Sequence, residues 1–124
     1  MDNIFSVIFC SVDFEALHNW HDIGEQEPCW FLAQKHRHVF KIKVYKRVYH
    51  DNRDSEFIAF KHEVLKFLKS QFVIDAKSGI PDISNRSCEM LGRMILNQFD
   101  AIKVEVSEDG ENGAIVYDAN STGV

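Results

Sequence analysis

Two histidines separated by a single residue are the strongest chemical signal in this sequence. His36 and His38 precede a run of alternating residues, so we expect both at the start of a β-strand. Side chains two residues apart on a strand point to the same side, with their Cα atoms about 7 Å apart. That spacing suits two nitrogen ligands of one metal ion. A third neutral imidazole, with one coordination position left open, would make a zinc site of the catalytic type.

His18 is the best candidate for the third ligand, because it follows the first strand-like segment of the chain. The alternative is that His-Arg-His lies at an exposed strand end and serves only solubility. His21, His50 and His62 are expected to be surface residues, although each could carry a proton with a pKa near neutrality. From the residues alone, metal binding and plain solvent exposure both stay open.

Hydrophobic periodicity predicts the elements that would position these histidines. Alternating β-branched and aromatic residues predict strands, and apolar residues at helical spacing predict two helices, the second capped by Ser87. The expected strands are residues 4–14, 39–48, 101–106 and 114–117, and the expected helices are residues 56–72 and 87–97. The turn-rich stretch SEDGENG predicts that the last two strands form a hairpin, and residues 73–86 are expected to form an irregular connection that could carry a short strand. This order predicts an α+β fold, an antiparallel sheet with two helices on one face.

Length and composition predict one domain rather than several. The chain has 124 residues, of which 45% are hydrophobic, and this is enough for a single core. We expect the domain over residues 1–118, followed by a flexible C-terminal tail at residues 119–124. Three cysteines without a CxxC pair predict neither a disulfide framework nor a cysteine zinc site, so a cytoplasmic location is expected. The short apolar N-terminal run lacks a basic region, so we expect no signal peptide and no membrane span.

The charge balance argues against a general nucleic-acid binder. The formal net charge is −5, whereas binding to phosphate backbones needs a net basic face. Cationic residues are concentrated between Lys35 and Lys69, with acidic segments on both sides. A basic middle between acidic ends could line a pocket for a small anion.

Several segments, taken together, resemble the 6-pyruvoyl-tetrahydropterin synthase and 6-carboxy-tetrahydropterin synthase family. The family's Phe-x-Ala-x-His segment and its His-Gly-His strand start are similar to residues 14–18 and to His36-Arg37-His38. The start of the family's first helix is similar to residues 56–61, and the start of its second helix is similar to residues 87–89. Its last strand pair is similar to residues 104–108 with Ala114 and Tyr117. The resemblance covers roughly residues 5–117 and follows the element order predicted above.

This resemblance implies a tunnelling fold (T-fold), in which each subunit has a four-stranded antiparallel sheet with two helices packed on one face. It also implies a homo-oligomer, a hexamer in the family, with a small-molecule pterin bound at subunit interfaces. In the family the three histidines hold zinc, so His18, His36 and His38 are the expected metal ligands. A glutamate in the last strand pair anchors the pterin ring, and Glu108 stands at the matching position.

The catalytic positions of the family match this chain less closely. The family's catalytic cysteine lies a few residues before its His-x-His pair, whereas Cys29 precedes His36 by seven residues. A thiol beside the metal would serve as a base or nucleophile, and a buried inert thiol is the alternative. Asp75 matches the aspartate of the family's Asp-His dyad, but Ala76 stands in place of the histidine. The ordinary proton relay is therefore expected to be absent.

An arginine replaces the central glycine of the family's His-Gly-His. Arg37 adds a cation on the opposite face of that strand, and with Arg47 and Arg53 it could clamp a phosphate or a carboxylate. The alternative is that these arginines are solvated and paired with the nearby carboxylates of Asp51, Asp54 and Glu56.

Two functions follow from these observations. The first is a zinc-dependent carbon–oxygen lyase acting on a reduced pterin such as dihydroneopterin triphosphate, with Cys29 and Asp75 as catalytic residues and Glu108 as the ring anchor. The second is a non-catalytic T-fold protein that binds or sequesters a purine-like or nucleotide ligand at subunit interfaces, with Arg37 and Arg53 on the phosphate. The complete histidine set favours the enzyme, and the incomplete dyad favours the binding protein.

Overall fold

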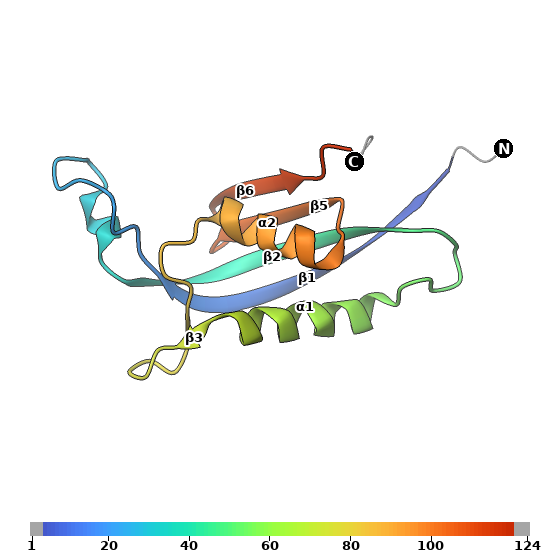
Figure 1. Ribbon diagram of the computed structural model, residues 1–124, viewed down its shortest axis with the longest axis horizontal. Coiled ribbons are helices and arrows are strands. Elements are labelled where there is room, and N and C mark those ends of the chain that lie inside the picture. The colour runs from blue at the N-terminus through green and yellow to red at the C-terminus, as the bar shows by residue number, and fades with distance from the viewer. Residues whose placement is uncertain (1–3, 121–124) are drawn as a thin grey trace.

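The chain folds into one twisted sheet with both α-helices on the same face (Figure 1). The computed structural model describes residues 4–120. The elements are β1 (Ser6–His18), the 3-10 helix η1 (Trp30–Ala33), β2 (His36–Val48), α1 (Phe57–Gln71), β3 (Val73–Ile74), β4 (Pro81–Asp82), α2 (Cys88–Phe99), β5 (Lys103–Glu108) and β6 (Asn112–Tyr117). The strand order in the sheet is β3-β4-β1-β2-β5-β6.

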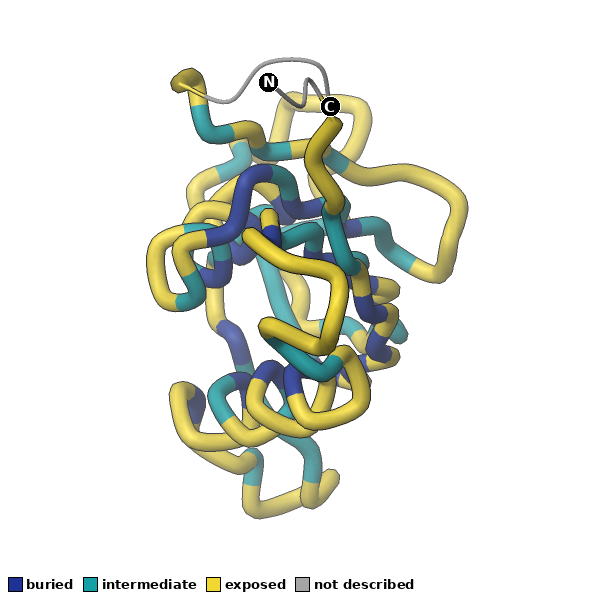
Figure 2. The backbone as a smooth tube through the Cα atoms, turned by 90° about the vertical axis from the view of Figure 1, so that its right-hand side faces the viewer, coloured by how far each residue is buried: buried dark blue, intermediate teal, exposed yellow. Residues whose placement is uncertain are grey.

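The two long strands β1 and β2 form the centre of the sheet. They pair antiparallel along their whole length, from Ser6 opposite Val48 to His18 opposite His36. Burial alternates along both strands, because every second side chain faces the helices and the others face solvent. Phe14 and Phe40, for example, are paired across the strands and buried. Figure 2 shows the buried residues gathered in the middle of the molecule, with exposed segments around them.

The helices cover the buried face in two halves, since α1 packs against β1 and α2 packs against β5 and β6. The buried residues of α1 are spaced at four-residue intervals, which places Phe60, Val64 and Leu68 on one side of the helix. The buried stripe of α2 contains Gly92, where an added Cβ would lie 2.7 Å from a side-chain methyl of Val116. The glycine thus lets α2 lie directly on β6. Within residues 4–120, no helix has the length and apolar content needed to cross a bilayer.

Both helices begin at side-chain caps. The Glu56 carboxylate accepts hydrogen bonds from the backbone N–H groups of Ile58 and Ala59, at 3.0 and 2.8 Å. The Ser87 hydroxyl accepts one from Met90 N–H at 3.2 Å, which confirms the cap predicted for the second helix. These caps satisfy N–H groups that the first helical turn leaves without partners.

The prediction of a four-stranded sheet is wrong, because the sheet has six strands. The two additional strands, β3 and β4, contain two residues each and lie in the connection between the helices. Such short segments leave no periodic pattern in a sequence. They form a small hairpin that joins the end of β1 through Leu17 opposite Asp82. The α+β class and the two helices on one face are confirmed, and the predicted tail at residues 119–124 lies outside the described residues from residue 121 onward.

We expect Gly113→Ala to destabilise the β5–β6 hairpin. A Cβ at this position would overlap the carbonyl oxygen of Val106 and lie 2.6 Å from the Cα of Ser107, the residue opposite Gly113 in the ladder. The backbone cannot move away without breaking the pairing. Urea denaturation should give a free energy of unfolding lower by about 2 kcal/mol.

Gly24→Ala is the matched control for this substitution, because the nearest atom to an added Cβ is 3.9 Å away. Its free energy of unfolding should stay within about 0.5 kcal/mol of the wild type. Equal stabilities of the two variants would contradict the steric argument.

Candidate metal centre and ligand pocket

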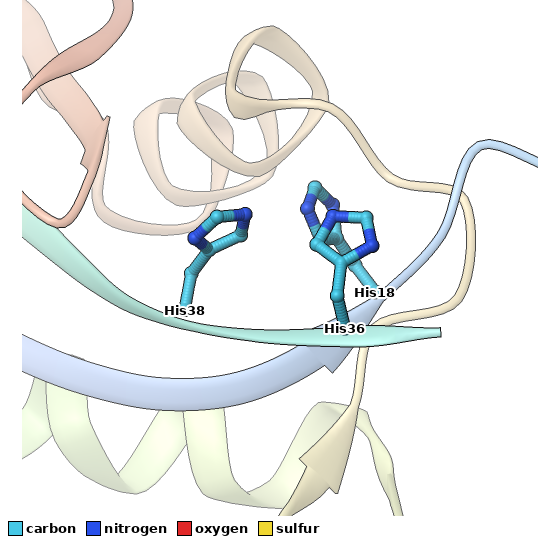
Figure 3. A group of neighbouring side chains, drawn as sticks. All are labelled: His18, His36 and His38. Atoms are coloured by element: carbon cyan, nitrogen blue, oxygen red, sulfur yellow. The ribbon is translucent and has the colours of Figure 1, made fainter. Parts of the chain in front are cut away.

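Strand register brings the three predicted histidines together. His18 is the last residue of β1 and His36 is the first residue of β2, and the two are direct cross-strand partners. His38 lies two residues further along β2, opposite Ala16, so its side chain is on the same face. The three candidate ligand nitrogens lie within 4.8 Å of one another. Figure 3 shows the three rings on the same side of the strands, with α2 above them.

The histidine cluster continues the hydrophobic core. The centroids of the His18 and His36 rings are 4.4 Å apart, and each is 5.0 Å from the centroid of His38. The fully buried ring of Phe40 lies against the cluster, 5.4 Å from the His18 ring and 5.9 Å from the His38 ring. Only 12% of the His18 side chain and 21% of the His38 side chain are exposed. Water is therefore largely excluded from one side of the cluster.

Hydrogen bonds select the same tautomer for His36 and His38. The Nδ1 of His36 lies 2.7 Å from the carbonyl oxygen of Gln34, and the Nδ1 of His38 lies 2.6 Å from a carboxylate oxygen of Asp109. Both partners can only accept, so each Nδ1 carries the proton when the ring is neutral. Each Nε2 is then left with a free lone pair, which is the form of imidazole that binds a metal ion.

Asp109 is held in place by three contacts to β2. Its Oδ1 accepts a hydrogen bond from the Val39 N–H at 2.9 Å, its own N–H donates to the Val39 carbonyl at 2.8 Å, and its Oδ2 bonds His38. Its φ of 57° is left-handed, a conformation that aspartate tolerates better than most residues. The hydrogen bond from Val39 and the bond to His38 hold the pKa of Asp109 below its usual value. Asp109 is therefore an anionic orienting group for His38.

His18 is the most deeply set of the three rings. Burial lowers the pKa of His18 below its ordinary value, and repulsion from His36 adds to this, while Glu108 and a backbone hydrogen bond to Arg86 act in the opposite direction. The Nε2 of His18 lies 3.1 Å from Glu108 Oε2, a contact short enough for an ion pair but without hydrogen-bond alignment. A hydrogen bond weakens steeply when it is bent, so this contact is an electrostatic one. Among the described residues, the buried Nε2 atoms of His18 and His36 have no hydrogen-bond partner.

These features fit a bound transition-metal ion. Buried polar atoms without partners are rare in folded proteins, and a bound ion is one explanation for them. Three imidazoles that converge beside a cavity match the donor set of a zinc site with an open position. The residues that would hold the ion are His18, His36 and His38.

A pocket of about 510 Å³ opens beside the cluster. His18, His36 and Glu108 form part of its wall, and Trp20 from the loop after β1 also lines it. The first turn of α2 contributes another part of the wall, including Cys88. The volume is in the range of cavities that bind small organic molecules.

Two predicted catalytic residues lie outside the wall of this pocket. Cys29 is exposed and stands at the N-terminus of the 3-10 helix η1. Asp75 lies after β3, where it accepts hydrogen bonds from Ser78 and lies 3.7 Å from the ammonium group of Lys35. The hydrogen bonds from Ser78 lower the pKa of Asp75 below its usual value. The structure therefore does not bring Cys29 or Asp75 together with the histidines.

The predicted arginines also lie away from the pocket. Arg37 is on the opposite face of the sheet, where its guanidinium lies 2.8 Å from the carboxylate of Glu15. Arg53 lies in the loop between β2 and α1, at the far end of β2, and its guanidinium donates to the Asn52 side chain at 3.2 Å. Glu108, in contrast, is in the pocket wall at the end of β5.

Cys88 and Asp109 are among the residues of the site that sequence reasoning missed. Cys88 is buried at the start of α2 and lines the pocket, and burial raises the pKa of its thiol to about 11. Asp109 orients His38 from the turn after β5. The sequence indicates only that a second carboxylate, Asp109, directly follows Glu108. The role of Asp109 depends on its contact with His38, which is 71 positions away in the chain. Nothing in the sequence distinguishes Cys88 from an ordinary helix residue.

Comparison with known proteins gives matches in structure alone. No protein-family model matches the sequence, and no curated protein matches it. The 6-pyruvoyl tetrahydropterin synthase of Caenorhabditis elegans matches with a TM-score of 0.66 at 15% identity, over 94% of this chain and 97% of that one. An uncharacterised protein from Wolinella succinogenes matches with a TM-score of 0.68 at 15% identity, over 93% and 99%. The 6-pyruvoyl tetrahydropterin synthase of Plasmodium falciparum matches with a TM-score of 0.56 at 19% identity, over 91% and 98%. The fold implied by the sequence resemblance is thus confirmed.

Asp109→Asn should weaken metal binding without removing a metal ligand. The amide can offer its nitrogen or its oxygen to His38, but it carries no negative charge to hold the Nδ1 proton. Loss of such an orienting carboxylate typically costs about 10- to 100-fold in metal affinity. Competition with a chromogenic zinc chelator measures this affinity. Glu111→Gln, in the same hairpin turn, removes an equal charge and should leave the affinity unchanged, so a similar loss in both variants would point to a non-specific charge effect.

The metal-free protein should lose stability as the pH falls below 6.5, the ordinary pKa of histidine. The pKa of His18 is lowered in the folded state, so the unfolded chain binds its proton more tightly. The stability that neutral His18 contributes is therefore present above the unfolded pKa and decreases as the pH falls. Denaturation with a chelator present, at several pH values from 7.5 to about 5.5, measures the slope. His18→Gln should flatten this slope and the exposed-site variant His62→Gln should not, whereas unchanged slopes in both would contradict the assignment.

Proposed function

We propose that this chain is a divergent 6-pyruvoyl-tetrahydropterin synthase-like protein that binds zinc through three histidines and acts on a reduced pterin. The observation that carries the proposal is the convergence of three imidazoles beside a ligand-sized pocket, with His18 and His36 in its wall and their buried Nε2 atoms without hydrogen-bond partners among the described residues. The shared fold supports the choice of substrate, because two of the matching structures are described as 6-pyruvoyl tetrahydropterin synthases. Dihydroneopterin triphosphate is the substrate that the sequence resemblance implies.

The residues of the site have separate roles in the proposed reaction. When bound, zinc would act as a Lewis acid on oxygen atoms of the substrate side chain. His36 and His38 present their Nε2 lone pairs because Gln34 and Asp109 hold the Nδ1 protons. The carboxylate of Glu108 can accept two parallel N–H bonds from the guanidine-like edge of a pterin.

Proton transfer in the proposed reaction would need a base beside the bound substrate. Cys29 as the base and Asp75 as the aspartate of the dyad stay predictions, since neither lines the pocket. The loop that carries Cys29 would have to move toward the histidines before the thiol could reach a bound substrate. Such rearrangements on ligand binding are common in loops that border active sites.

A second candidate function is supported by the same placement. A pocket with metal ligands but without Cys29 or an Asp-His dyad in its wall could bind a purine-like or nucleotide ligand without converting it. Ala76 occupies the position of the dyad histidine, and its side chain cannot carry a proton. In this alternative the protein would sequester its ligand.

The proposal includes a homo-oligomer in the cytoplasm. Sheet order leaves β6 at one edge, and among the described residues β1 is paired on its outer side only near its end, at Leu17. Open edges of this kind favour the addition of strands from other copies, as in the hexamer that the resemblance implies. The cysteines are free, which agrees with a reducing compartment.

Metal content and turnover together test the proposal. Wild-type protein should contain about one zinc per chain, and His38→Ala should lose most of it because a three-ligand site then has two ligands. His62→Ala, which removes an exposed histidine of α1, should keep its zinc. Chromatography should show conversion of dihydroneopterin or of its triphosphate by the wild type but not by His38→Ala.

The outcomes separate the two candidate functions. A pterin that binds and is recovered chemically unchanged would favour the binding protein. Absence of zinc from the wild type, or equal zinc in His38→Ala, would overturn the metal centre itself.

A further inference from the structure

The residues that this chain itself contributes to the ligand pocket carry charges opposite to those that a triphosphate needs. Three carboxylates line it, those of Asp22, Glu89 and Glu108. Arg86 is the one lysine or arginine among the lining residues. A triphosphate carries about four negative charges, and proteins bind such groups through converging arginines, lysines and N–H donors.

Arg86 is already engaged by its own chain. Its Nη1 donates to the carbonyl oxygen of Ile83 at 3.1 Å, and its guanidinium lies over the ring of Phe72 at 5.1 Å. These contacts hold the guanidinium against the core. A phosphate would have to displace them to form a bidentate pair with Arg86.

The start of α2 is the other part of the pocket wall that could attract an anion. Helix N-termini often bind phosphate through free N–H groups and the helix dipole. In this helix the Ser87 hydroxyl takes the N–H of Met90, and Glu89 places a carboxylate in the first turn. The chain therefore supplies its own acceptors where a phosphate would bind.

The arginines that the sequence offered as a phosphate clamp do not change this balance. Arg37 pairs with Glu15 on the other face of the sheet, and Arg53 lies at the far end of β2. A divalent ion on the histidines would add two positive charges. Carboxylates already surround that position, since Glu108 lies 3.1 Å from His18 Nε2 and 3.7 Å from His38 Nε2, and Asp109 bonds the His38 ring.

We propose that this pocket selects a reduced pterin whose side chain carries no phosphate, with Asp22 and Glu89 as the residues that discriminate against the phosphorylated form. This inference rests on the proposed function and names its substrate class. The carboxylates suit the N–H groups of the heterocycle and the hydroxyl groups of a short side chain, because ionised carboxylates only accept hydrogen bonds. The same carboxylates repel a triphosphate.

Calorimetric titration of the zinc-loaded protein with 7,8-dihydroneopterin and with its triphosphate tests the inference. The unphosphorylated pterin should bind about tenfold more tightly, as expected for several partly screened like charges. In the double variant Asp22→Asn/Glu89→Gln the ratio of the two dissociation constants should move toward one. Glu63→Gln, which removes an exposed charge on α1 far from the pocket, should leave the ratio as in the wild type.

Each outcome of the titration has a separate meaning. Tighter binding of the triphosphate by the wild type would overturn this inference and leave the proposed function standing, since a pterin still binds. An unchanged ratio in the double variant would also overturn it, because the two carboxylates would then not set the preference. Binding of neither pterin would overturn the proposed function, and the inference would fall with it. Inorganic triphosphate should not displace dihydroneopterin, and displacement would contradict the proposed charge selection.

Discussion

The register between β1 and β2 is the constraint on which the candidate centre depends. Pairing of His18 with His36 places two rings side by side, and the two-residue repeat of β2 adds His38 on the same face. A slip of one residue would turn His18 to the solvent face and bury its neighbour instead. The large buried side chains of both strands oppose such a slip, since Phe14 and Phe40 would leave the core. Core packing thus fixes the geometry of the polar cluster.

Polar contacts then decide what the cluster can do. Burial lowers the pKa of His18 and so favours its neutral form, and acceptors on the Nδ1 atoms of His36 and His38 leave the Nε2 atoms of those rings for a metal ion. The same low-dielectric surroundings make unpaired Nε2 atoms costly, so a cation bound to them would remove a penalty as well as form bonds. The carboxylates of Asp22, Glu89 and Glu108 add negative charge to the pocket wall beside the histidines. The centre and the pocket therefore favour cations and N–H donors.

Much of the fold and the histidine set could be predicted because both leave periodic patterns. Alternating residues fixed β1 and β2 closely enough to place His36 and His38 on one face, and capping chemistry located α2 at Ser87. The two-residue strands β3 and β4 are too short for any pattern. The positions of Cys88 and Asp109 depend on where α2 and the β5–β6 turn dock, which local sequence does not encode. For a loop residue such as Cys29, the sequence shows the chemical type of the side chain but does not predict where it lies relative to the histidines.

The hydrogen bonds of Asp109 connect the β5–β6 turn to the metal centre. One carboxylate joins the turn to the backbone of Val39 and to the ring of His38 at the same time. If the β5–β6 turn frayed, His38 would lose its contact with Asp109 and would bind a metal ion less tightly. Metal binding therefore stabilises the closed hairpin. Backbone amides of β6 would then exchange with solvent more slowly when the centre is filled. An edge strand that supplies none of the three histidines thus reports on whether the metal centre is occupied.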